Sequence, residues 1–273
     1  MSVEQMVRAG VIIVLLAGTA CTSTTVKSTT IGHSSVYTAE SAGHEAKRDR
    51  DQEAVETYIQ LGLGYLSKGE RQRSRANFLK AFERDENSVG AHGGIALLYQ
   101  LEQENLLAEK HFLSALELDP KATSVRNNYA IFLYRQQRYG EASRQFSLTA
   151  TDLTYARRGQ VFLSLGLSEK QRDKLDSAIK AWEKALRLNP SLTEPHLELA
   201  DASFYLGDYV IAKLHLDHYR KKREPSARSL WLALRLERIF GNRDGEESRG
   251  LALEKLFPYS QENLEYQIWR QAK

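Results

Sequence analysis

The apolar positions between residues 55 and 226 recur with a period of 34 residues. Large apolar side chains stand at Phe78, Phe112 and Phe146, and the series continues at Trp182 and Leu216 after a two-residue insertion near 157–158. Three series of small residues keep the same register: Gly62, Ala96, Ala130, Gly166 and Ala200; Ser74, Ala108, Ala142, Ala178 and Ala212; and Ala81, Ala115, Thr149 and Ala185. Repeats of this length are helix–turn–helix units that cannot bury their apolar faces alone, so they stack on one another.

The small residues lie where the two helices of a unit are expected to cross. Helix axes approach to within about 8–10 Å only where the side chains at the crossing permit it. Gly62 with Ser74 would supply this contact in the first unit, and the large residue of each unit would fill the wedge toward the next. The columns resemble the tetratricopeptide repeat. They predict an all-α fold, a tetratricopeptide-repeat superhelix of about six helix–turn–helix repeats with a C-terminal capping helix.

The register assigns the repeats along the chain. They are residues 55–88, 89–122, 123–156, 159–192 and 193–226, with a degenerate sixth repeat and the cap in 227–273; the whole solenoid is 55–273. The last segment contains the helical sequence LWLALRLERIF and ends with ENLEYQIWRQ, which follows Ser260 as a candidate N-cap. Terminal repeats depart from the consensus because one of their sides faces water.

The first residues have the pattern of an export signal. Arg8 precedes the apolar run VIIVLLAGTA, which at about 10 residues is too short to span a bilayer. Cys21, the only cysteine of the chain, follows this run directly, so no intrachain disulfide is available. The arrangement resembles a bacterial lipoprotein signal, which would make residues 1–20 the signal peptide and Cys21 the lipidated first residue. The alternative is an ordinary export signal with an incidental thiol.

Residues 21–53 are expected to form a flexible tether. This segment is rich in Ser, Thr, Ala and charged residues and shows neither helical nor strand periodicity. Such a composition buries too little apolar area to order a chain. The residue after the cysteine is Thr22 and not an Asp. In such lipoproteins this indicates sorting to the outer membrane. We therefore expect a protein that is lipid-anchored in the outer membrane and faces the periplasm.

The sequence YIQLGLGYL at 58–66 carries apolar residues on more than one side of its predicted helix. One side would pack inside the repeat, and the other, set by the second, fifth, ninth and twelfth positions of each first helix, would face the concave groove. The predicted partner-binding groove consists of Ile59, Leu63, Leu66, Leu97, Gln100, Asn127, Ile131 and Tyr134. Gly90 and Gly93 are expected to open room there. The alternative is that the leucines contact one another or the linker of the chain itself.

Charge and candidate chemistry add little to this picture. The net charge of +3 is too small to predict nucleic-acid binding, and the basic run at 220–223 is typical of a helix C-terminus. His215 and His218 could share a metal ion, but no third ligand is evident, so we predict neither a metal site nor a cofactor. Signal, tether and repeats leave no room for a catalytic domain. We predict a non-enzyme that is a monomer.

A narrower resemblance follows from three further stretches. The lipoprotein signal together with YIQLGLGYL, VRNNYAIFLYRQQRYGEA and ARSLWLALRLERIFGNRD resembles the type IV pilus biogenesis and stability lipoproteins of the PilF/PilW kind, over about residues 55–260. The resemblance implies a pilotin that binds the type IV pilus secretin and promotes its outer-membrane localisation or assembly, and hence twitching motility. Two alternatives stay open. One is a periplasmic scaffold that docks cell-envelope enzymes, and the other is an enzyme with an unrecognised site.

Overall fold

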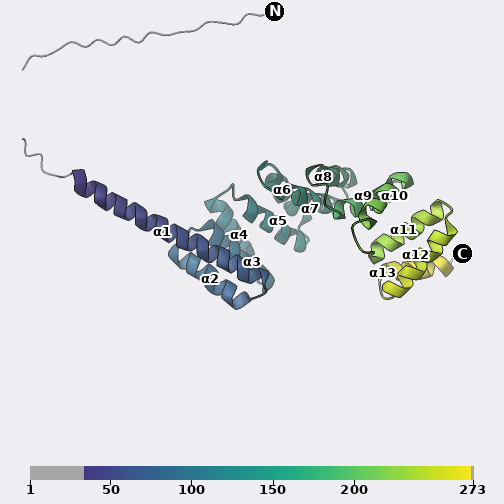
Figure 1. The fold of residues 1–273 in the computed structure, drawn as a ribbon, viewed down its shortest axis with the longest axis horizontal. Helices are drawn as coiled ribbons and strands as arrows, with labels where there is room; N and C mark the ends of the chain where they lie inside the picture. Colours follow the sequence, from purple (N-terminus) through teal and green to yellow (C-terminus); the bar gives the residue numbers. More distant parts are fainter. Residues whose placement is uncertain (1–33, 272–273) are drawn as a thin grey trace, which may run out of the picture. The chain divides into compact units, whose positions relative to one another are not determined.

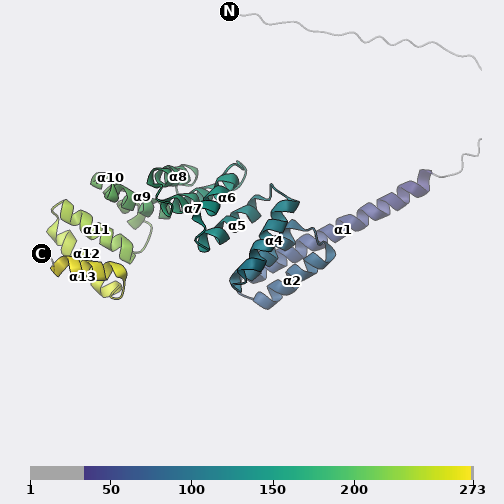
Figure 2. The ribbon, with the colours of Figure 1, turned by 180° about the vertical axis from the view of Figure 1, so that it is seen from behind.

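The computed structural model describes residues 34–271, which form thirteen α-helices and no β-strand. The helices are α1 (Ser34–Ser67), α2 (Arg71–Arg84), α3 (Val89–Leu101), α4 (Asn105–Leu118), α5 (Thr123–Arg135), α6 (Tyr139–Ala150), α7 (Arg158–Lys170), α8 (Leu175–Leu188), α9 (Glu194–Tyr205), α10 (Tyr209–Arg220), α11 (Ala227–Ile239), α12 (Arg243–Leu256) and α13 (Gln261–Gln271). They make six consecutive pairs and one final helix (Figure 1). The all-α repeat fold expected from the sequence is confirmed, and α13 packs against α11 and α12 (Figure 2).

The turn inside each pair has a left-handed residue at one fixed place. Glycine supplies it in three pairs, at Gly69, Gly207 and Gly241, with φ between 73° and 84°. In the other three pairs it is Gln103, Gln137 and Asp173, with φ between 58° and 63°. Side chains with a Cβ adopt this conformation only at some cost. The turn geometry is therefore imposed by the packing of the helices that it joins.

The buried core is built around the large residues of the 34-residue series, each of which is enclosed. Phe78, Phe112, Phe146 and Trp182 are all fully buried, and Leu216 is nearly so. The ring of Phe78 lies between two glycines, and a Cβ added to Gly62 or Gly94 would approach it within 2.5 Å and 2.3 Å. Ser74 Oγ donates a hydrogen bond of 2.8 Å to the carbonyl oxygen of Gly62 at the expected crossing. The small columns thus permit the close helix approach that the sequence predicted.

The N-terminal part of the chain differs from expectation. Internal contacts divide the protein into residues 1–48 and residues 49–273. The sequence predicted no helix before about residue 55, but α1 already begins at Ser34. The stretch before the repeats contains GHEAKRDRDQEA, and Ala, Glu, Lys and Arg are strong helix formers even without an apolar stripe. Its role as a tether stays a prediction.

The proposed signal peptide and Cys21 lie outside the described residues. Between Ser34 and Gln271 no helix is both long enough and apolar enough to cross a bilayer.

Candidate partner-binding surface

The first helices of the N-terminal repeats meet at a small apolar pocket. Helix α3 contacts α5, and α5 contacts α7, so these helices form one continuous side of the solenoid. The pocket has a volume of about 240 Å³ and is lined from α1, α3 and α5 by Leu66, Leu97, Gln100, Leu101, Asn128, Ile131 and Arg135. We call these residues the apolar pocket. Because small-molecule sites usually measure about 300–1,000 Å³, its size suits an apolar side chain of a partner better than a cofactor.

Two amide side chains give the apolar pocket unused hydrogen-bonding capacity. Gln100 Oε1 is buried and accepts no hydrogen bond from any group in the described chain. Asn128 lines the same pocket, and no hydrogen bond of its side chain occurs within residues 47–271. A buried amide oxygen without a donor costs free energy, which a donor from a bound backbone would recover. Asn127, the residue before Asn128, likewise makes no side-chain hydrogen bond to another helix within residues 47–271.

Half of the predicted groove residues come together in the apolar pocket. Leu66, Leu97, Gln100 and Ile131 all line it, and the three apolar ones also pack partly against the core. Leu101 and Arg135 were missed. They lie four residues after Leu97 and Ile131, one helical turn along the same face, and directly after Gln100 and Tyr134, the last positions that the pattern included. Extending the same stripe by one turn would have found them.

Ile59 was wrongly assigned to the groove. Its side chain is only 6% exposed and packs with Val55, Ala81 and Ala91 in the core between α1, α2 and α3. The room expected at Gly90 is filled by Ile59 itself, whose Cδ1 would lie 2.6 Å from an added Cβ. Gly93 likewise faces Val125. These glycines therefore allow helices to approach and do not open a pocket.

The other predicted residues lie outside the apolar pocket. Leu63 is 37% exposed on α1, and Asn127 is half-buried on α5. Tyr134 makes an edge contact with Tyr139, their ring centroids 5.2 Å apart. Burial raises the pKa of the Tyr134 hydroxyl, with smaller contributions from Tyr139 and from the charge of Glu198 on α9.

A second, larger pocket follows between α7 and α11. It has a volume of about 910 Å³, and its lining includes Leu175, Glu198, Asp201, Phe204, Tyr209 and Arg235. We call it the aromatic pocket. Arg228 donates hydrogen bonds of 2.5 and 2.8 Å to the two carboxylate oxygens of Glu198 and also pairs with Asp201. Its charged groups make this part of the surface unlike the apolar groove that the sequence predicted.

The acidic residues of the aromatic pocket are held by cations on both sides. Lys170 Nζ on α7 donates a 2.9 Å hydrogen bond to Glu198 Oε2. Burial works to raise the pKa of Glu198, but the hydrogen bonds and charges of Arg228 and Lys170 outweigh it, so the pKa lies below its usual value. For Asp201 burial prevails, and its pKa is raised although Arg228 opposes this. These ion pairs join α7, α9 and α11 and fix the pocket walls.

Histidines pair at equivalent places in two repeats. His92 Nδ1 lies 3.0 Å from His111 Nδ1, and His196 Nδ1 lies 3.0 Å from His215 Nδ1. His218, considered above with His215, stacks on His196 with ring centroids 5.0 Å apart. Across the described ranges, no three His, Cys, Asp or Glu side chains are arranged to hold a metal ion.

Comparisons with known proteins agree with this architecture. Residues 55–88 match the tetratricopeptide repeat family. The type IV pilus assembly protein PilF of Pseudomonas aeruginosa is 36% identical over 215 residues, which cover 79% of this chain and 85% of PilF. A solved structure of P. aeruginosa PilF is similar with a TM-score of 0.77 at 39% identity, covering 80% of this chain and 98% of that one. The fold is also similar to that of PilW, a type IV pilus biogenesis factor, with a TM-score of 0.68 at 23% identity over 78% of this chain and 98% of that one.

Proposed function

Because the chain belongs to the PilF family of type IV pilus assembly proteins, we propose that it serves type IV pilus biogenesis as a pilotin. In this proposal it binds the pilus secretin and promotes the localisation or assembly of secretin in the outer membrane. It acts as a monomer, by binding and not by catalysis. Tetratricopeptide-repeat surfaces suit this role because stacked helices present an extended side along which a segment of another protein can lie.

The observation that carries the proposal is the apolar pocket. Leu66, Leu97 and Ile131 present apolar area beside the unpartnered Gln100 amide, and a bound segment needs both an apolar anchor and a backbone partner. Leu101 extends the apolar wall to solvent with 41% of its side chain exposed. A secretin segment would place one apolar side chain in the pocket while its backbone meets Gln100 and Asn128.

A charge placed at the pocket tests this role. Leu101→Glu would put a carboxylate against an apolar side chain, so we expect secretin multimers in the outer-membrane fraction to fall at least fivefold in a strain producing only this variant. Leu113→Glu is the matched control, because Leu113 is 49% exposed on α4 and does not line the pocket. Equal multimer levels in both variants, at equal protein levels, would refute pocket binding. Unchanged multimers in a strain lacking the protein altogether would favour the scaffold that docks cell-envelope enzymes.

The membrane anchor is a separate part of the proposal. Cys21 is the single cysteine and the proposed acylation site. A residue carrying several acyl chains holds a protein firmly at a membrane, whereas one chain binds only marginally. Cys21→Ser should therefore move the protein from the outer-membrane fraction to the soluble periplasmic fraction without altering the circular dichroism of the purified repeats. Retention of the variant in the outer membrane would show that another contact anchors it.

A further inference from the structure

The aromatic pocket contains a guanidinium group without an acid to pair with. Arg235 on α11 lines the pocket, and its Nε is buried and donates no hydrogen bond to any residue of the described chain. No carboxylate between residues 47 and 271 lies within ion-pair distance of it. Arg228, two turns earlier on the same helix, is fully engaged by Glu198 and Asp201. The two arginines therefore differ: Arg228 is paired with acids of the pocket wall, whereas Arg235 contacts no acid there.

Aromatic rings hold Arg235 in place. The guanidinium carbon lies 4.3 Å from the ring centroid of Phe204 and 5.1 Å from that of Trp231. Such contacts stabilise a cation, but by less than a buried charge loses by leaving water. Burial accordingly lowers the pKa of Arg235, and the charges of Asp201 and Glu265 offset only part of this effect. A carboxylate brought by a partner would stabilise this group further.

The acids and cations around the pocket balance in number, and Arg235 is the cation that contacts no acid. Lys170 and Arg228 pair with Glu198 and Asp201, and the charge of Asp173, the remaining acid of the lining, is exposed to water that screens it. Phe204 and Tyr209 make an edge contact beside Arg235, with ring centroids 5.4 Å apart. Tyr205 next to them is 81% exposed. A bound carboxylate would thus be flanked by exposed aromatic surface.

We propose that the aromatic pocket binds an internal acidic segment of a protein partner, with an Asp or Glu side chain on Arg235 and a neighbouring aromatic or large aliphatic side chain on Phe204, Tyr205 and Tyr209. An internal segment fits because the surface continues past the pocket. Helix α5, which carries Ile131 and Arg135 of the apolar pocket, contacts α7, which carries Lys170 of the aromatic pocket, so a chain can continue from one pocket toward the other. The proposal concerns a different pocket from the one on which the secretin assignment depends.

Short peptides test the proposal on the purified repeat protein. The first probe is an acetylated and amidated peptide with a Phe-Asp-Phe centre, and its partner probe carries Asn in place of Asp. Trp231 contacts Arg235, so tryptophan emission reports on the pocket. We expect saturable binding of the Asp peptide, at least tenfold weaker binding of the Asn peptide, and a loss of affinity on raising the salt concentration. The comparison of the two peptides requires no variant of the protein.

Two arginines of α11 provide a matched pair of variants. Arg235→Met keeps most of the side-chain length and should weaken binding of the Asp peptide at least tenfold. Arg238→Met should leave it within twofold, because Arg238 stacks on Trp269 at 3.9 Å and lies outside the pocket. Equal binding of the Asp and Asn peptides, equal binding by the two variants, or no saturation at millimolar peptide would overturn the proposal. Binding only of a peptide with a free C-terminal carboxylate would overturn the assignment to a side chain.

Discussion

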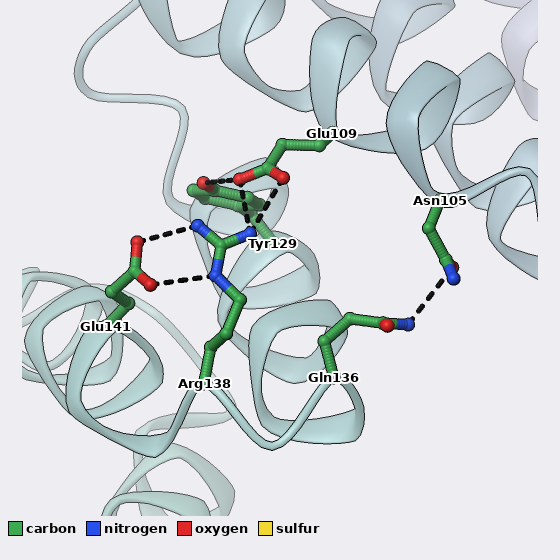
Figure 3. Close-up of polar contacts among 6 residues, drawn as sticks. All are labelled: Asn105, Glu109, Tyr129, Gln136, Arg138 and Glu141. Atoms are coloured by element: carbon green, nitrogen blue, oxygen red, sulfur yellow. Dashed lines mark hydrogen bonds and ion pairs between the residues drawn. The ribbon is translucent and has the colours of Figure 1, made fainter.

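Arg138 Nη1 donates hydrogen bonds of 2.7 Å to both carboxylate oxygens of Glu109 (Figure 3). Glu109 lies on α4 in the second repeat and Arg138 in the turn before α6 in the third, so the pair crosses the boundary between repeats. Glu109 Oε1 also accepts a 2.7 Å hydrogen bond from the hydroxyl of Tyr129, and Glu141 holds the guanidinium from the other side. Burial and this hydrogen bond to Glu109 raise the pKa of Tyr129 above its usual value.

Removal of Arg138 should loosen this boundary. Arg138→Met leaves Glu109 partly buried with Tyr129 as its remaining partner, so we expect the free energy of unfolding to fall by about 1–3 kcal/mol. Urea unfolding, monitored by circular dichroism, measures this free energy. A double-mutant cycle with Glu109→Gln should give a coupling energy of at least about 0.5 kcal/mol. Glu117→Ala, on the exposed face of the same α4, should change stability by less than about 0.5 kcal/mol.

Two glycines should respond in opposite directions to alanine. A Cβ at Gly94 would lie 2.3 Å from Cε1 of the fully buried Phe78 ring, so Gly94→Ala forces the α2–α3 contact apart and should cost about 1–3 kcal/mol. Gly64 lies in α1 with no atom within 4 Å of an added Cβ. Gly64→Ala should stabilise the helix by about 0.5–1 kcal/mol. Thermal unfolding midpoints that shift in the same direction for both variants would contradict this packing.

The repeat fold could be predicted from the sequence because its determinants are periodic. Phe78 and Gly62 have equivalents at the same positions of the other repeats. In the structure the Phe78 ring is fully buried and lies against Gly62, as expected. The turn conformations could not be predicted, since only half of the turns carry glycine and Gln103 adopts the left-handed form under packing constraints alone. Helix α1 also begins earlier than the repeat pattern, because helix propensity does not depend on that pattern.

The binding surface was only partly predictable for a different reason. Ile59 lies on the border between two faces of α1, where the space around the side chain decides which face it joins. Because Gly90 has no side chain, Ile59 fills the space beside it and packs into the core. Sequence position alone placed Ile59 and Leu63 on the same stripe. The charged aromatic pocket also escaped prediction, because the pairing of Arg228 with Glu198 joins residues 30 positions apart. Only the distances in the folded chain distinguish the paired Arg228 from the unpaired Arg235.

Ile59 and Leu63 should therefore differ sharply when each is replaced by glutamate. Ile59→Glu buries a carboxylate beside Val55, Ala81 and Ala91, so we expect loss of several kcal/mol and local unfolding of the first repeat. Leu63→Glu places the charge at an exposed position and should keep the far-UV circular dichroism and the unfolding midpoint close to wild type. Hydrogen exchange of α1 and α2 distinguishes the two outcomes. Unfolding of the Leu63 variant would mean that Leu63 belongs to the core.

Acid should destabilise the fifth repeat through His196. Burial, followed by the nearby His215 and His218 and then Lys222, lowers the pKa of His196 to about 4. In the unfolded chain a histidine has a pKa of about 6.5, so between pH 6.5 and 4 the unfolded state binds the proton and the folded state does not. Stability therefore falls as the pH is lowered through this window. With allowance for partial exposure, the contribution of His196 is about 1–3 kcal/mol.

The variant His196→Gln isolates this contribution. It removes the titrating ring while keeping a polar side chain, so the difference in unfolding free energy between wild type and variant should shrink by about 1–3 kcal/mol on going from pH 7 to pH 4. Above pH 7 His196 is neutral in both the folded and the unfolded chain, and the difference should stay constant. Urea unfolding at a series of pH values measures both ranges. A difference that does not change between pH 7 and pH 4 would show that His196 takes up its proton in the folded protein as readily as in the unfolded chain.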